Sequence, residues 1–145
     1  MSVRDNIEQI RKRIEKAALS VNRDPNEISI VAVSKNVAPS KILEAIDAGI
    51  TIVGENRVQE LVKKYDVINK NISWHMIGSL QTNKVKYNID KVDLIHSLDR
   101  LSLAQELNKR AGAMGRKIQA LVQVNMSKES TKSGVYEEDL LSFIE

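Results

Sequence analysis

Short apolar runs alternate with amphipathic segments along most of this sequence, and that alternation restricts the fold more than any other feature. The apolar runs begin about every 20 to 25 residues, and the segments between them carry apolar residues at helical spacing. Parallel strands need a crossover of this kind, whereas antiparallel neighbours can be joined by a tight turn. We therefore predict an α/β protein with a parallel sheet. The expected strands are 28–33, 51–53, 73–77, 93–96 and 119–124, and the expected helices between them are 39–48, 55–68, 81–87 and 101–113.

Helices are also expected at both ends of the chain. Residues 3–21 carry apolar side chains at helical spacing, and Ser2 with Asp5 resembles an N-terminal cap. Pro25 disfavours helix at the residue before it, so this helix should end close to Pro25. A last helix is expected to begin near Tyr136. The first strand, 28–33, is continuously apolar, which indicates burial on both faces of the sheet.

Two architectures fit this order of elements. A doubly wound open sheet needs no more than the five strands present, whereas a (β/α)8 barrel needs three more. The pattern alone therefore favours the open sheet. Neither a glycine-rich dinucleotide fingerprint nor a P-loop follows any expected strand, so a nucleotide site is unsupported.

Length and composition limit the class of protein further. The 145 residues form a single expected domain, 1–145, and the absence of cysteine excludes disulfides and thiolate chemistry. No apolar stretch is long enough to span a membrane and the N-terminus lacks a secretory signal, so we expect a cytoplasmic protein without membrane contact. The net charge is +3, but acidic residues are interspersed with the basic ones and only 3% of residues are aromatic. A nucleic-acid-binding module is therefore the weakest interpretation.

Active sites of parallel α/β proteins gather at the carboxyl ends of the strands, and Lys35 follows the most apolar strand. Partial burial there would lower the pKa of its amine and make it nucleophilic toward a carbonyl. The alternative is a lysine that simply reaches into solvent. Asn56 follows the second strand and is either a ligand contact or part of the first turn of the next helix.

The remaining polar candidates are weaker. His75, between Trp74 and Met76, is more typical of a hydrogen-bonded core histidine than of a catalytic base, and Gly78 with Ser79 forms either a phosphate nest or a turn. With two histidines and no carboxylate at a suitable spacing from either, a zinc site is not expected.

Six segments at these strand ends, in order, resemble the pyridoxal-phosphate homeostasis proteins. They are Val-Ala-Val-Ser-Lys at 31–35, Gly-Glu-Asn-Arg-Val-Gln-Glu at 54–60, His-Met-Ile-Gly-Ser-Leu-Gln-Thr-Asn-Lys at 75–84, Ile-His-Ser-Leu-Asp-Arg at 95–100, Gln-Val-Asn at 123–125 and Lys-Ser-Gly at 132–134. Together they extend across nearly the whole chain, which makes the resemblance specific.

The resemblance implies a parallel (β/α) barrel of the alanine-racemase N-terminal-domain type, preceded by an N-terminal helix, with about five βα units present. It therefore replaces the open sheet as our expected fold. It also implies that pyridoxal 5'-phosphate (PLP) is held as an aldimine on Lys35 with Asn56 beside the cofactor, and we place His75 and Ser79 in the same site. The implied role is intracellular homeostasis of PLP and vitamin B6, with amino or keto acids as further small-molecule partners and without established catalytic turnover. A PLP-dependent amino-acid racemase of the same barrel type is the alternative, and it would need a second acid/base residue such as a tyrosine at a strand end.

The sequence departs from the family in length. Its members are longer, and their last three strands supply a phosphate cradle and an arginine near the pyridine nitrogen. A five-stranded part of a barrel would expose two sheet edges and one side of its apolar interior. We therefore expect the chain to fold marginally or as a homo-oligomer.

Overall fold

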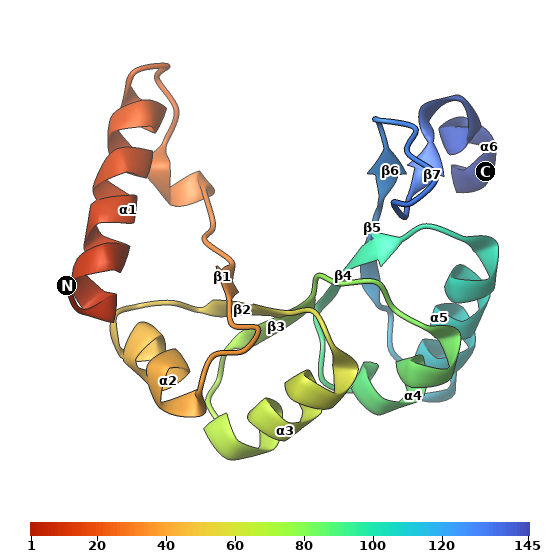
Figure 1. Ribbon diagram of the computed structural model, residues 1–145, viewed down its shortest axis with the longest axis horizontal. Coiled ribbons are helices and arrows are strands. Elements are labelled where there is room, and N and C mark those ends of the chain that lie inside the picture. Colours follow the sequence, from red (N-terminus) through yellow and green to blue (C-terminus); the bar gives the residue numbers. More distant parts are fainter.

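A computed structural model describes residues 1–145 and contains one parallel five-stranded sheet with helices packed against it (Figure 1). In chain order the elements are α1 (Val3–Leu19), the 3-10 turn η1 (Pro25–Glu27), β1 (Ala32–Val33), α2 (Pro39–Asp47), β2 (Ile52–Glu55), α3 (Val58–Ile68), β3 (Ser73–Met76), η2 (Thr82–Lys84), α4 (Val85–Asn88), β4 (Leu94–Leu98), α5 (Leu101–Ala113), β5 (Gln119–Val122), β6 (Val124–Asn125), β7 (Val135–Tyr136), η3 (Glu137–Asp139) and α6 (Leu140–Ile144). The predicted α/β class with a parallel sheet is confirmed.

The order of the strands decides between the two candidate architectures. Strands β1 to β5 are neighbours in chain order and every pair is parallel. Helices α2, α3, α4 and α5 all lie along one side of the sheet, as Figure 1 shows. A doubly wound sheet reverses its strand order and carries helices on both faces, whereas a barrel adds each strand beside the last with every helix outside. The structure is therefore part of a (β/α) barrel, and the open sheet favoured by the pattern alone is wrong.

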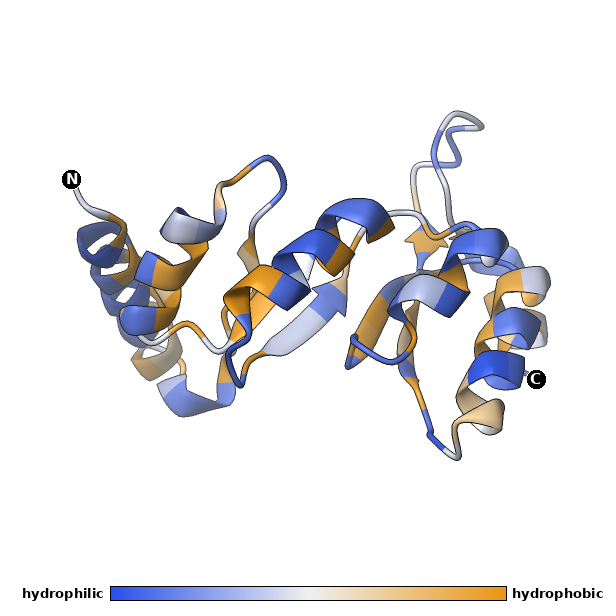
Figure 2. Ribbon diagram, turned by 90° about the horizontal axis from the view of Figure 1, so that it is seen from below, coloured by the Kyte–Doolittle hydropathy of each residue, from blue (hydrophilic) through white to orange (hydrophobic).

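The core lies between the sheet and its helices. Val53, Trp74 and Ile95, from the three central strands, are almost completely buried on this side. The opposite face of the sheet is open at its two outermost strands, where the side chains of Val33 and Leu121 are 52% and 51% exposed. In Figure 2 the hydrophobic colour lies on strands as well as on helices, where it alternates with hydrophilic residues. Burial on both faces was therefore the wrong expectation for β1, because β1 is an edge strand with nothing over its second face.

Helix α1 begins as the sequence predicts and packs against α2. Ser2 and Asp5 form a reciprocal capping box, in which each side chain accepts a hydrogen bond from the backbone N–H of the other. Arg4 and Arg11 donate hydrogen bonds to the carbonyl oxygens of Asp47 and Gly49, at and just beyond the end of α2. The predicted apolar stripe is only partly used, since Ile10 and Val21 remain exposed and the helix ends at Leu19.

Several predicted boundaries change in the structure. The strand expected at 28–33 is regular only over Ala32–Val33, the two residues that pair with Val53 and Gly54 of β2. The strand expected at 119–124 divides into β5 and β6, and β6 pairs with the unpredicted β7 in a separate two-stranded sheet. The helix expected at 81–87 is a 3-10 turn followed by the short α4, and the last helix follows β7 and η3 instead of beginning at Tyr136.

Candidate functional site

The carboxyl ends of parallel strands β1, β2 and β3 place Lys35, Asn56 and Ser79 along one edge of the sheet. Lys35 and Ser79 are exposed and Asn56 is half-buried. The expected partial burial of Lys35 is therefore wrong for this chain. Strand β1 lies at the edge of the sheet, and the face on which Val33 lies is uncovered. Solvent therefore reaches the Lys35 side chain, which follows Val33 by two residues.

The backbone that carries Lys35 is held from two sides. The buried Ser34 hydroxyl lies within hydrogen-bond distance of the Glu55 carboxylate, and its backbone N–H continues the pairing with β2. Asn36 adopts a left-handed conformation with φ of 60°, which asparagine tolerates better than most residues. Its N–H donates a 2.7 Å hydrogen bond to Glu60 Oε1 on α3.

A second lysine, Lys64, lies beneath the same loop and has a different environment. Its Nζ donates to the carbonyl oxygen of Ser34 at 2.6 Å and to the carboxylates of Glu55 and Glu60 at 2.6 and 2.7 Å. An ammonium group has three donors, so all three are used. Lys64 is therefore a structural cation, which leaves Lys35 as the accessible amine of this loop.

Sequence reasoning missed Lys64, although the sequence carries a signal for it. Lys64 shares the buried stripe of α3 with Leu61 and Ile68, at spacings of three and four residues. Glu60 precedes it by one helical turn, the arrangement in which a carboxylate and an amine meet.

Gly78 brings the tips of β2 and β3 into contact. A Cβ atom at this position would overlap the carbonyl oxygen and Cα of Asn56. The Ile77 N–H also donates to the Glu55 carbonyl oxygen at 2.9 Å, which extends the pairing to the strand ends. Asn56 thus lies in a tightly packed rim between β2 and α3, and the helix expected from residue 55 begins only at Val58.

Ser79 meets the segment that follows β5. Its hydroxyl lies 3.4 Å from that of Ser133, and the Gln123 side-chain amide donates to the Ser133 carbonyl oxygen. The Asn125 amide holds the same loop through the carbonyl oxygens of Glu129 and Lys132. Ser79 therefore belongs to a polar rim shared by β3, β6 and the loop before β7.

His75 lies within β3 and is almost completely buried. Its Nδ1 is 2.9 Å from Nε2 of His96 on β4, so one ring donates a hydrogen bond to the other. Burial lowers the pKa of both imidazoles, and the neighbouring ring lowers that of His75 further. The prediction of a hydrogen-bonded histidine is confirmed, and its side-chain partner is His96, not Lys35, Asn56 or Ser79.

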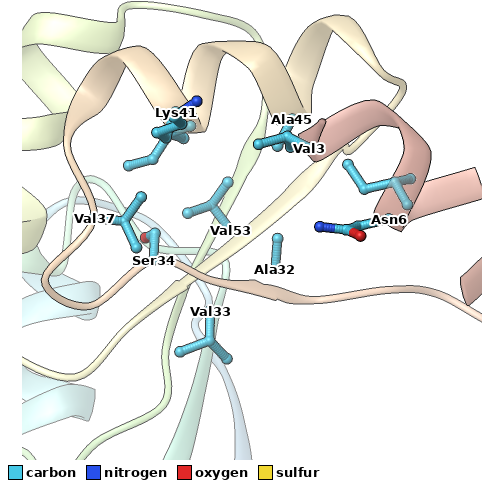
Figure 3. A pocket seen from close by; sticks show the side chains of 11 residues that line it. Val3, Asn6, Ala32, Val33, Ser34, Val37, Lys41, Ala45 and Val53 are labelled. Atoms are coloured by element: carbon cyan, nitrogen blue, oxygen red, sulfur yellow. The ribbon is translucent and has the colours of Figure 1, made fainter. Parts of the chain in front are cut away.

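An apolar pocket lies on the other side of β1, between α1 and α2. It is lined by Val3, Asn6, Ile7, Ala32, Val33, Ser34, Val37, Lys41, Ile42, Ala45 and Val53. In Figure 3, Ser34 and Val53 point toward α2 while Val33 points the opposite way. The pocket is therefore on the helix side of the sheet and is separate from the polar rim.

The chain matches curated proteins along its entire length. It is 42% identical over 146 residues to the pyridoxal phosphate homeostasis protein of Aquifex aeolicus, an alignment that covers 100% of this chain and 64% of that protein. It is 41% identical over 134 residues to the protein of the same name from Escherichia coli K12, covering 90% of this chain and 57% of that protein. The chain is a homologue of the pyridoxal phosphate homeostasis proteins. It spans about three-fifths of the length of these relatives.

Solved structures share the fold of this chain. The crystal structure of an unknown protein from Bifidobacterium adolescentis superposes with a TM-score of 0.90 at 30% identity, over 97% of this chain and 62% of that one. PipY of Synechococcus elongatus with PLP bound superposes with a TM-score of 0.77 at 34% identity, over 90% and 61% of the two chains. None of the protein-family models matches the chain. The barrel fold expected from the family resemblance is therefore confirmed for the part of the barrel present here.

No helix of this homologue combines the length and apolar character that crossing a bilayer requires. No group of three or more metal-ligating side chains is present either.

Proposed function

We propose that this homologue of the pyridoxal phosphate homeostasis proteins binds PLP through Lys35 and takes part in the homeostasis of PLP and vitamin B6. The observation that carries the proposal is the contrast between Lys35, in the loop after β1, and Lys64, which lies beneath that loop on α3. Lys35 is exposed at the strand end where the family resemblance places the cofactor lysine, whereas the three donors of Lys64 are occupied.

The residues at the rim fit the chemistry of PLP. PLP is an aldehyde, and a primary amine can attack its carbonyl carbon to form a carbon–nitrogen double bond while the carbonyl oxygen leaves as water. Lys35 supplies a primary amine for this step, and since its side chain is exposed, burial is not what would make the amine reactive. The amide of Asn56 and the hydroxyls of Ser79 and Ser133 offer neutral hydrogen-bonding partners at the neighbouring strand ends.

Each of the four residues of the proposed site has a different place and role. Lys35 is the covalent residue of the proposal, and Asn56 lies on the adjacent tip where Gly78 fixes its backbone. Ser79 contributes a hydroxyl that faces the loop before β7. His75 lies deeper on the open face, so we assign it to the wall of the site in its neutral form.

Binding without turnover is the form of the function that we propose. A racemase would need a second acid/base residue on the other side of the cofactor. The three tyrosines do not supply one at the tips of β1 to β5. Tyr65 packs against Trp74 on the helix side, Tyr87 lies in α4 beside Lys84 and Lys86, and Tyr136 belongs to β7. We further propose that amino or keto acids exchange with the bound cofactor and that the protein acts in the cytoplasm.

Chemical trapping tests the role of Lys35. The chain is incubated with PLP, reduced with borohydride and digested, and the modified lysines are identified by mass spectrometry. We expect one dominant adduct on Lys35, which Lys35→Ala abolishes. Lys41→Ala is the matched control, because Lys41 is also exposed and lies on the next helix. Equal labelling of many lysines, or an undiminished total adduct in Lys35→Ala, would contradict the proposal.

A further inference from the structure

The two peptide groups on either side of Lys35 are both bound by α3. The carbonyl oxygen of Ser34 accepts a hydrogen bond from Lys64 Nζ at 2.6 Å. The N–H of Asn36 donates to Glu60 Oε1 at 2.7 Å. Lys64 and Glu60 are one helical turn apart and are themselves paired at 2.7 Å. The backbone before and after Lys35 is thus tied to one rigid element.

The bonds from Lys64 to Ser34 and Glu55 are shielded from water, whereas the bond from Asn36 to Glu60 lies at the exposed side of the cluster. The side chain of Lys64 is 7% exposed and that of Glu55 is 0% exposed. The side chain of Glu60, at the outside of the cluster, is 24% exposed. Charged hydrogen bonds gain strength where the local dielectric is low. The bonds that Glu60 receives from Lys64 and from the Asn36 N–H also hold the pKa of its carboxyl below its ordinary value.

We propose that Glu60 and Lys64 are positioning residues for Lys35, an inference that rests on the proposed function. They fix the direction in which the Lys35 side chain leaves the backbone, while its amine stays exposed and free to react. A backbone fixed before PLP arrives does not have to be ordered when the bond forms, and such preorganisation favours both the rate and the extent of condensation. Holding this backbone in place is the role that we assign to the buried lysine–glutamate cluster under the exposed Lys35 loop.

Replacing Glu60 tests the proposal with little risk to the fold, since this side chain is the outermost member of the cluster. Glu106→Ala is a closely matched control. Glu106 pairs with Arg110 one turn along α5 at 2.8 Å and is 22% exposed, and it lies on a different helix from the Lys35 loop. Condensation of PLP with Lys35 is followed by quenching with borohydride at successive times and measuring the Lys35 adduct by mass spectrometry.

We expect Glu60→Ala to lower the rate or extent of the Lys35 adduct by about tenfold, the effect of losing one charged hydrogen bond. Glu60→Gln should recover part of the loss, because its amide oxygen can still accept from the Asn36 N–H. Glu106→Ala should label Lys35 as the wild-type chain does. An adduct in Glu60→Ala that forms as fast and as completely as in Glu106→Ala would overturn the proposal.

Hydrogen exchange of the Asn36 amide, measured without PLP, gives a readout that is independent of the cofactor. We expect this amide to exchange at least about tenfold faster in Glu60→Ala than in the wild-type chain, since its acceptor is removed. Amides of β3 should keep their protection. Unchanged exchange at Asn36 would show that Glu60 does not hold the loop and would overturn the proposal directly.

The two experiments distinguish a failure of the proposed function from a failure of the positioning role. If the wild-type chain forms no Lys35 adduct, the proposed function fails and the positioning role toward PLP falls with it, whatever the exchange of Asn36. If the wild-type adduct forms and Glu60→Ala neither slows nor reduces it, the positioning role alone fails.

Discussion

Gly78 is the residue at which the backbones of two neighbouring strand ends press together. An added methyl group would meet the backbone of Asn56, which cannot turn aside as a side chain can. We expect Gly78→Ala to lower the free energy of unfolding by about 1 to 3 kcal/mol, the usual cost of overpacking. Urea unfolding followed by circular dichroism measures it.

Gly112 provides the control for that substitution. It lies within α5, and apart from its chain neighbours and the backbone of its own helix no atom lies within 4 Å of an added Cβ, so Gly112→Ala should stabilise the chain by about 0.5 to 1 kcal/mol. A Gly78→Ala chain as stable as Gly112→Ala would show that the strand tips are not in close contact.

The histidine pair predicts how stability depends on pH. The folded-state pKa of both His75 and His96 lies below the ordinary value of 6.5, because burial disfavours their charged form. The unfolded chain therefore binds more protons near this pH, and the free energy of unfolding should fall as the pH is lowered through 6.5.

Denaturant titrations between pH 7.5 and about pH 5 measure this effect above the range in which most carboxylates titrate. In the double variant His75→Asn/His96→Asn, the free energy of unfolding should fall much less as the pH is lowered. A wild-type chain whose stability is constant across this range, or a double variant with the same slope, would contradict the interpretation.

At the level of single residues, the sequence predicts where the rim side chains lie better than it predicts their environments. Lys35, Asn56 and Ser79 follow from the positions at which apolar strands end. The exposure of Lys35 does not follow, because it depends on what covers the far face of β1 and not on the residues next to it. The pairing of the Lys64 amine does not follow either, because one of its acceptors, the Ser34 carbonyl oxygen, is 30 residues away in the sequence.

Helix α3 is the element that joins the sheet to the Lys35 loop, and its stability should depend on keeping Lys64 and Glu55 together. Lys64→Met leaves the fully buried Glu55 carboxylate without its cation. We expect this change to cost about 3 to 5 kcal/mol, the effect of leaving an uncompensated charge in the interior.

The double variant Glu55→Gln/Lys64→Met removes the stranded charge and should recover much of that loss. Chemical denaturation of the two single variants and the double variant gives the coupling between these residues. If the two single effects simply add, Glu55 and Lys64 do not form a coupled buried pair.

The elements also differ in how far the sequence defines them. Helices α1, α2 and α5 lie close to their predicted bounds because apolar spacing and local stop signals such as Pro25 specify them. Strand β1 is shorter than its apolar run, because regular pairing needs a partner and β2 begins only at Ile52, one residue before the partner of Ala32. The pairing of β6 with β7 joins residues separated by a polar loop and has no periodic signal in the sequence.

For the molecule as a whole, the sequence pattern determines the class but not the architecture. Repeated strand and helix segments are common to doubly wound sheets and barrels, and the difference is the spatial order of strands. The six family-like segments supply what periodicity lacks, because they link particular strand ends to one known arrangement. The structure then shows a sequential parallel sheet with its helices on one side.

An open face and two unpaired edges give the last prediction, which concerns the state of the 145-residue chain in solution. Val33 and Leu121 expose apolar surface on the open face, and β1 and β5 each have only one neighbour. Apolar surface and free strand edges favour association with a second copy. We expect light scattering to show a mass above that of one chain, rising with concentration.

Val33→Lys/Leu121→Lys should shift the chain toward the monomer, whereas Val67→Lys, at an exposed position on α3, should not. A wild-type monomer that stays monomeric over the same range and melts cooperatively would show that the open face is stable in water.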